Sequence, residues 1–258
     1  RQRQMCIRDR TRNNISRKEC LLLPVNTTLD ALNKKSGEPA WKTNRSVDFT
    51  GVQVNQRKAY GTPLIIPRGD KKQMISIGAK GVYSYDPYNG KELWKATHRG
   101  WSIAPRPVYG EGLVFTMIDR DRPEMWAIRP NGKGDITKTH IEWKETKRMP
   151  PRASPLIVNG LLFVVDRNGY ISCLEAKTGK SIWQKRMRGR FSASPILAND
   201  LIYFFNEDTL CTIIKPDRKF EIIAENELAE GQLMATPAFD ENSIYVRTAK
   251  NLYRIKKE

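Results

Sequence analysis

Histidine is nearly absent from this sequence, and cysteine is scarce. Only two histidines, His98 and His140, occur in 258 residues, and the four cysteines show no C-x-x-C spacing. These absences exclude zinc ribbons, c-type haem attachment and a disulfide scaffold. The longest apolar runs, Leu21–Val25 and Leu161–Val165, are far shorter than the roughly 20 residues that a membrane-spanning helix requires. The sequence therefore predicts neither a transmembrane segment nor histidine-rich metal chemistry.

Negative charge is also in short supply. The chain has 28 Asp and Glu against 45 Lys and Arg, a net charge of +17, and its 39% hydrophobic content is sufficient for a folded core. Such a surplus favours anionic partners, namely polysaccharide, lipid headgroups or acidic protein surfaces; the other interpretation is a basic surface in contact with water. Recognition modules for nucleic acid do not occur, so a specific nucleic-acid partner is not expected.

The first ten residues, RQRQMCIRDR, differ from the rest of the chain. They carry four arginines and no hydrophobic periodicity. They resemble a translated sequencing adaptor, and we expect residues 1–10 to be a non-native tail; an arm that binds polyanions is the alternative. Residues 11–258 are expected to form one repeat domain.

Two motifs recur along that domain. The first is a proline preceded by a small or polar residue, and successive copies are 44, 48, 40 and 42 residues apart: Thr62-Pro63, Arg106-Pro107, Ser154-Pro155, Ser194-Pro195 and Thr236-Pro237. Each proline precedes a short apolar run, a turn and a second β-rich run, as in PLIVNGLLFVV from residue 155. Turns such as NG between alternating apolar residues indicate β-hairpins.

The second motif spans eleven residues and ends in tryptophan. Its copies share an Asn, Asp or Glu at the third position, Gly at the seventh and Trp at the eleventh: Asn33, Gly37, Trp41; Asp86, Gly90, Trp94; Glu175, Gly179, Trp183. The polar side chain suits a turn backbone, the glycine suits a positive φ, and we expect each tryptophan to cover a contact between repeats. Two segments depart from the pattern: residues 127–143 contain extra residues before Trp143, and Cys211–Glu221 lacks both Gly and Trp.

A period near 40 residues with two motifs in phase predicts a β-propeller, an all-β fold of four-stranded antiparallel blades. The alternative is a β-sandwich, which does not explain the period. The predicted blades are 11–45 (partial), 58–97, 101–146, 150–187, 190–226 and 232–258 (partial). We therefore expect an incomplete ring of five to six blades; the family resemblance described next implies that the closed ring has eight.

The tryptophan motif resembles that of the pyrroloquinoline quinone (PQQ) repeat propellers over residues 20–258. This family includes quinoprotein alcohol dehydrogenases and a propeller lipoprotein of bacterial outer-membrane assembly. The resemblance implies a periplasmic or secreted, non-catalytic scaffold that binds protein partners and needs no cofactor. Two alternatives remain: a fragment of a dehydrogenase using PQQ with calcium, and a module binding anionic polysaccharide. The dehydrogenases often have adjacent cysteines, whereas Cys6, Cys20, Cys173 and Cys211 are all separated.

Candidate binding residues lie near the proline motifs, where the innermost strand of each blade should line a central funnel. Arg106 replaces the hydroxyl residues found before the other prolines. The candidates for holding an anionic group or a peptide carboxylate are Tyr60, Trp101, Arg106, Arg152 and Arg190. Two basic clusters, in residues 144–152 and 185–190, lie at links between blades and are expected to share one face. No catalytic or metal-binding residue is predicted.

Overall fold

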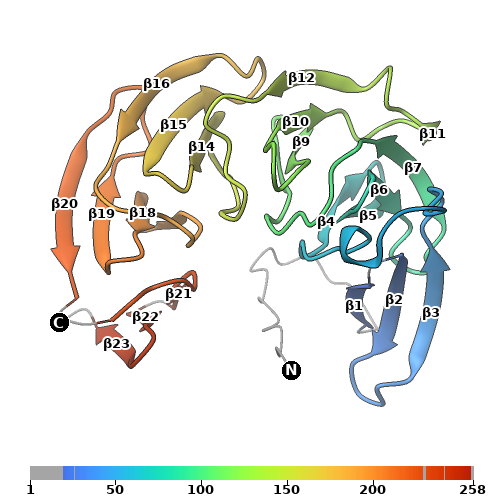
Figure 1. Cartoon of the computed structure of the whole chain (residues 1–258), viewed down its shortest axis with the longest axis horizontal. Helices are drawn as coiled ribbons and strands as arrows, with labels where there is room; N and C mark the ends of the chain where they lie inside the picture. Colours follow the sequence, from blue (N-terminus) through green and yellow to red (C-terminus); the bar gives the residue numbers. More distant parts are fainter. Residues whose placement is uncertain (1–19, 26, 229–230, 241, 257–258) are drawn as a thin grey trace.

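The computed structural model describes residues 20–25, 27–228, 231–240 and 242–256, and its regular structure is almost entirely β-strand. The strands form six sheets that follow one another along an arc around a shared centre (Figure 1). The helix found in this part of the chain is one 3-10 turn, η1 (Val54–Gln56). The predicted all-β fold of small antiparallel sheets arranged as propeller blades is confirmed. The predicted tail, residues 1–10, lies outside the described residues, as does Cys6.

The sheets run in chain order, and within each blade successive strands are neighbours. The first sheet contains β1 (Cys20–Val25), β2 (Thr28–Asn33) and β3 (Pro39–Asn44). The second contains β4 (Leu64–Arg68), β5 (Lys71–Gly78), β6 (Gly81–Tyr85) and β7 (Glu92–Thr97), and the third contains β8 (Val108–Gly110), β9 (Leu113–Met117), β10 (Met125–Ile128) and β12 (Ile141–Glu145).

The last three sheets repeat the same order. The fourth sheet contains β13 (Leu156–Val158), β14 (Leu161–Val165), β15 (Tyr170–Glu175) and β16 (Ser181–Arg186). The fifth contains β17 (Ile196–Ala198), β18 (Leu201–Phe205), β19 (Leu210–Ile214) and β20 (Ile222–Glu227). The sixth contains β21 (Ala238–Phe239), β22 (Ser243–Arg247) and β23 (Leu252–Lys256).

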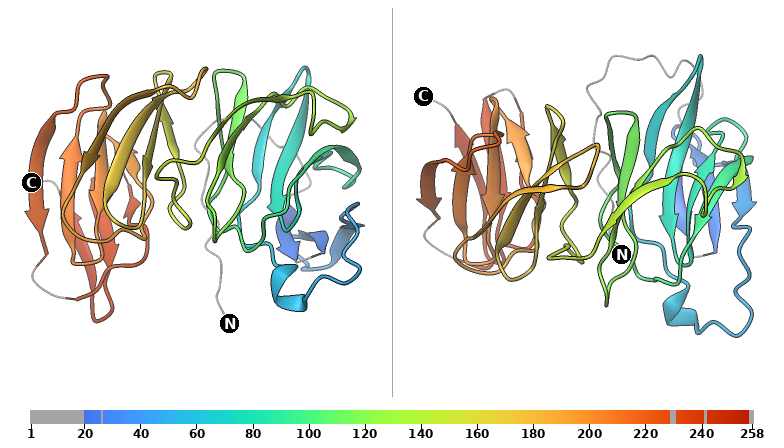
Figure 2. Two further views of the ribbon diagram at one scale, coloured as in Figure 1. Left: turned by 45° about the horizontal axis from the view of Figure 1, so that its top comes forward. Right: turned by 90° about the horizontal axis from the view of Figure 1, so that it is seen from above.

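The hydrophobic core is divided among the spaces between neighbouring sheets, whose faces are turned toward one another (Figure 2). Side chains of β14 show how one strand serves two such spaces. Leu162 and Val164 belong to the cluster shared with the third sheet, while Phe163 and Val165 belong to the cluster shared with the fifth. Because alternate side chains of a strand point to opposite faces, an inner strand buried on both faces reads as a continuous apolar run.

One irregularity recurs at the same place in the first five sheets. The register between the last two strands shifts after Ala31, Ser84, Ala127, Cys173 and Ile213, whose partners are Trp41, Trp94, Trp143, Trp183 and Ala224. Ile213 of the fifth sheet therefore occupies the position that Cys173 has in the fourth. The segment that the sequence assigned to this motif, Cys211–Glu221, begins two residues too early. The fifth sheet pairs a large Ile213 with a small Ala224, whereas the others pair a small residue with tryptophan.

The extra residues before Trp143 form a strand of their own. Strand β11 (Gly134–Asp135) pairs in parallel with β7 at Trp94 and Lys95, so the insertion covers the outer edge of the second sheet. The N–H of Ile136 donates to the Lys95 carbonyl at 2.8 Å, and the N–H of Thr97 donates to Thr137 Oγ1 at 2.8 Å. The insertion thus fastens the third blade to the second, which the sequence did not predict.

Candidate functional site

The turns of each blade lie alternately at its two ends, because successive strands are antiparallel. We name one end the link end: it carries the turn between the second and third strands and the link into the next blade. In the fourth blade these are residues 166–169 and 187–195. The opposite, turn end carries the other two turns, including the Gly179 turn. All five candidate binding residues lie on links between blades, and therefore toward the link end.

The tryptophans contact the turn end of the following blade. The indole N–H of Trp41 donates to the Pro87 carbonyl at 3.3 Å, and that of Trp94 donates to the Pro130 carbonyl at 3.2 Å. Trp143 and Trp183 repeat the contact with the carbonyls of Ala176 and Asp217, at 3.0 and 3.1 Å. Trp143, which sequence reasoning set apart because of its spacing, makes the same contact as the others. Trp94 is fully buried, whereas Trp41 and Trp183 are half-buried.

The motif glycines make room for these rings. Gly90 has φ +73°, and a Cβ at this position would lie 2.5 Å from the Trp41 ring. Gly179 has φ +72°, and a Cβ there would lie 2.7 Å from Trp143. Gly37 has the same backbone conformation, φ +76°, but nothing described lies within 4 Å of its Cβ position. The turn residues Asn33, Asp86 and Glu175 each accept a backbone N–H bond from the motif glycine at 2.8–2.9 Å, through their own carbonyls.

The hydroxyl residues before the prolines link successive blades near the centre of the arc. Ser154 Oγ accepts the N–H of Arg106 at 2.9 Å, Ser194 Oγ accepts the N–H of Ser154 at 2.9 Å, and Thr236 Oγ1 accepts the N–H of Ser194 at 3.0 Å. Each hydroxyl therefore satisfies the backbone of the preceding blade. The small polar residues of the first motif are explained by this chain of bonds.

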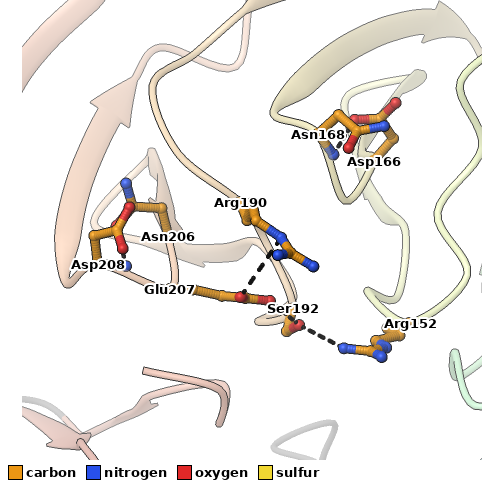
Figure 3. A network of polar contacts seen from close by, with 8 residues as sticks. All are labelled: Arg152, Asp166, Asn168, Arg190, Ser192, Asn206, Glu207 and Asp208. Atoms are coloured by element: carbon orange, nitrogen blue, oxygen red, sulfur yellow. Dashed lines mark hydrogen bonds and ion pairs between the residues drawn. The ribbon is translucent and has the colours of Figure 1, made fainter. Parts of the chain in front are cut away.

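Two of the five predicted funnel residues meet in one network (Figure 3). Arg152 Nη1 donates to Ser192 Oγ at 3.3 Å, and the Ser192 hydroxyl donates to Glu207 Oε1 at 2.6 Å. Arg190 Nε lies 3.9 Å from Glu207 Oε2, and the Glu207 side chain is almost buried. Glu207 and Ser192 were not predicted from the sequence, because the residues of the network come from different repeats.

The other three funnel residues do not join that network. Tyr60 is exposed, and Trp101 is half-buried with the Arg120 guanidinium 4.9 Å from its ring centroid. Arg106 is half-buried, and its Nε is enclosed without a hydrogen-bond partner among the described residues. Among the described residues, no hydrogen bond or ion pair joins Tyr60, Trp101 or Arg106 to the network of Arg152 and Arg190, and the shared funnel stays a prediction.

The described residues near this network do not fit the calcium-dependent alternative. Calcium takes six to eight oxygen ligands, usually with several carboxylates. Beside Arg152 and Arg190, the Glu207 carboxylate is already engaged by a hydroxyl and a guanidinium. In the described part of the chain, no three His, Cys, Asp or Glu side chains are grouped to hold a metal ion.

The thiols of Cys173 and Cys211 are poorly reactive. Cys173 and Cys211 are buried and free, and burial raises the pKa of each thiol to about 12. A thiol with such a pKa is almost entirely protonated near neutral pH and is a poor nucleophile. The described residues also contain no helix with the length and apolarity to cross a bilayer.

These features define a β-propeller built from PQQ-like repeats. The profile of the family described as "Outer membrane protein assembly factor BamB" matches residues 78–219, and the chain belongs to that family. A curated relative, "Outer membrane protein assembly factor BamB" of Moranella endobia (strain PCIT), is 22% identical over 243 residues. The match covers 88% of this chain and 56% of that protein, so the chain spans little more than half the length of its relative.

Solved structures share the fold. The crystal structure of BamB from Moraxella catarrhalis superposes with a TM-score of 0.66 at 15% identity, covering 92% of this chain and 69% of that one. The computationally designed protein Ika8 superposes with a TM-score of 0.65 at 8% identity, covering 94% of this chain and 69% of the designed one. At these identities the similarity concerns the architecture alone.

Proposed function

We propose that this chain belongs to a non-catalytic propeller of the bacterial cell envelope, periplasmic or secreted, that binds protein partners as a scaffold. The observation that carries the proposal is the match of residues 78–219 to the BamB family. The family is named for a factor in the assembly of outer membrane proteins, a task that involves binding between proteins.

The use of the recurrent residues supports a scaffold. The motif tryptophans and glycines serve the contacts between blades, as do the hydroxyls before the prolines. A propeller whose repeated motif residues are occupied in this way presents its links and turns as a rigid surface for partners. The absence of any cofactor is part of the proposal.

The proposal is tested by isolating the complete gene product from its own cells. The protein carries an affinity tag, cells are treated with a reversible crosslinker, and captured proteins are quantified by mass spectrometry against a tagged, unrelated envelope protein. We expect reproducible enrichment of one or a few envelope proteins. Recovery of the tagged protein alone from the cytoplasmic fraction would overturn the proposal.

A further inference from the structure

Six cations gather at the link end of the fourth blade. They come from the link that enters this blade, from its turn at 166–169, and from the end of β16 with the link that leaves it. We call this set the arginine surface: Lys147, Arg148, Arg167, Lys185, Arg186 and Arg188. All six side chains belong to exposed residues.

Backbone bonds hold this surface in one piece. The N–H of Met187 donates to the Gly169 carbonyl at 2.8 Å, and the N–H of Phe191 donates to the Arg167 carbonyl at 3.1 Å. The leaving link is therefore bound to the turn of the same blade. The guanidinium carbons of Arg148 and Arg186 lie 3.9 and 5.6 Å from the ring centroid of Tyr170, which joins the entering link to β16.

Five of the six cations have no carboxylate within ion-pair distance in the described part of the chain. The exception is Arg148, whose Nη1 lies 3.8 Å from Asp166 Oδ2. Asp166 is itself buried, and its Oδ1 accepts the backbone N–H groups of Asn168 and Tyr170. Local carboxylates therefore leave the positive potential of this surface largely uncompensated, and an anionic partner would find it attractive.

At the turn end of the fourth and fifth blades three cations lie beside carboxylates, whereas two exposed lysines, Lys180 and Lys219, have none within ion-pair distance among the described residues. Arg218 lies 3.3 Å from Glu175, Lys177 lies 3.4 Å from Glu111, and Lys215 lies 2.9 Å from Glu221. Among the described residues, the fourth blade thus has the five unpaired cations of the arginine surface at its link end and one unpaired cation, Lys180, at its turn end. The asymmetry marks the link end as the face that meets an anion.

We propose that the arginine surface binds an acidic segment of a protein partner, an inference that rests on the proposed scaffold function. Four of the six cations are arginines, whose planar guanidinium matches carboxylates with two parallel hydrogen bonds. The surface is ordered before binding, which reduces the entropic cost of association. A glycan is disfavoured because the arginine surface has no exposed aromatic ring among the described residues. Tyr170 is covered by two guanidiniums, and the exposed rings, Tyr60 and Tyr88, lie beside the second blade.

The test measures binding of a fluorescent peptide rich in Glu and Asp to the full chain by fluorescence anisotropy. The variant is the double substitution Arg186→Glu and Arg188→Glu. The matched control is Lys34→Glu with Lys35→Glu, which makes the same change of charge on two exposed, adjacent cations at the turn end. Unchanged circular dichroism and melting temperature show that both variants are folded.

We expect the arginine variant to bind the peptide at least about tenfold more weakly, and the control to change affinity by less than about twofold. Binding by the wild-type chain should weaken between about 0.1 M and about 1 M salt, as the Debye length falls from about 10 Å to about 3 Å. Equal losses in both variants would show attraction by net charge alone and would overturn the inference, as would the absence of binding.

Two further probes separate the anionic classes. Polygalacturonate and vesicles containing anionic phospholipid are titrated under the same conditions. Tighter binding of either probe than of the peptide, lost in the arginine variant, would reassign the surface and overturn the protein assignment. If the complete protein captures partners in cells and the arginine variant captures them equally, the arginine surface fails while the scaffold function stands. If the peptide binds as expected but no partner is captured, the scaffold function fails instead.

Discussion

The hydroxyl of Ser194 accepts the backbone N–H of Ser154, its counterpart one blade earlier, at 2.9 Å. The same position is thus a donor toward the next blade through its N–H and an acceptor from the preceding blade through its side chain. A repeat of this bond near the centre of the arc requires a hydroxyl immediately before each proline. Arg106, which has none, donates through its N–H to Ser154 but cannot serve as acceptor for the blade before it.

Replacing Ser194 with alanine tests this bond. The substitution leaves the Ser154 N–H without its acceptor, and we expect the free energy of unfolding to fall by about 1–2 kcal/mol. Ser181→Ala, at an exposed position of β16, is the control and should change it by less than about 0.5 kcal/mol. Urea denaturation followed by tryptophan fluorescence measures both; indistinguishable variants would contradict a structural role for the hydroxyl.

The contact between tryptophan and glycine is tested by comparing two alanine substitutions. Gly37 and Gly90 both have positive φ, so either substitution should cost about 1–2 kcal/mol of backbone strain. Only at Gly90 does the new methyl group meet neighbouring side chains, the Trp41 ring and Thr43 Oγ1 at 2.5 Å each, which adds about 1–3 kcal/mol. We expect Gly90→Ala to be the more destabilising in chemical denaturation. Equal costs would mean that the ring moves aside freely.

Removal of a buried tryptophan should be more damaging. Trp94 is fully buried and donates to both the Pro130 carbonyl and Gln73 Oε1, so Trp94→Ala should lower the free energy of unfolding by about 3–5 kcal/mol. Trp183 is only half-buried, and we expect Trp183→Ala to cost less. The midpoints of urea denaturation rank the two variants; a larger loss for Trp183→Ala would contradict the burial argument.

Acid should destabilise the blades around His98. Both ring nitrogens are enclosed, and burial lowers the pKa of this imidazole to about 3. Between that value and about 6.5, the ordinary histidine pKa, the unfolded chain binds a proton that the folded chain does not. This difference has no effect above pH about 6.5, and below it the free energy of unfolding falls by about 1.4 kcal/mol per pH unit. Melting curves from pH about 7 to about 5 should show this loss, and His98→Phe should flatten it.

A thermal scan tests the proposed absence of a cofactor. A ligand at about 100 times its dissociation constant stabilises a folded protein by about 2.7 kcal/mol. We expect PQQ with calcium to leave the melting temperature of the complete gene product unchanged, with no oxidation of alcohols by an artificial electron acceptor. Calcium-dependent turnover that is abolished by one carboxylate substitution would favour the dehydrogenase alternative.

The fold was predictable because its signals repeat within the chain. The spacing of the prolines and of Trp41, Trp94 and Trp183 predicted a radial arrangement of antiparallel blades. Each blade forms from strands close together in the sequence, so local patterns were sufficient for this prediction. The role of Trp143 was missed because eleven-residue spacing was required, whereas the contact depends on strand register, and β11 absorbs the extra residues. The shifted assignment at Cys211 has the same origin. In the fifth sheet the residue paired at the register shift is Ala224, where the earlier sheets have a tryptophan.

The candidate site was less predictable, because its contacts join residues of different repeats. Arg152 and Arg190 were selected for charge and position, and they meet through Ser192 and Glu207, which carry no distinguishing sequence pattern. Arg106 and Trp101 satisfied the same criteria but make no hydrogen bond or ion pair with that network among the described residues. Alignment on the prolines predicts which end of a blade a residue occupies, and not which side chains converge there.

The most direct test of the account in which the arginine surface is the face that binds a protein partner is photo-crosslinking in living cells. A photoreactive amino acid replaces Arg188 at the link end or, as the matched control, Lys35 at the turn end of the complete protein. The account predicts a discrete crosslinked product, identified by mass spectrometry as one envelope protein, from position 188 and not from position 35. Equal products from both positions, or none from position 188 in a folded and correctly localised protein, would contradict it.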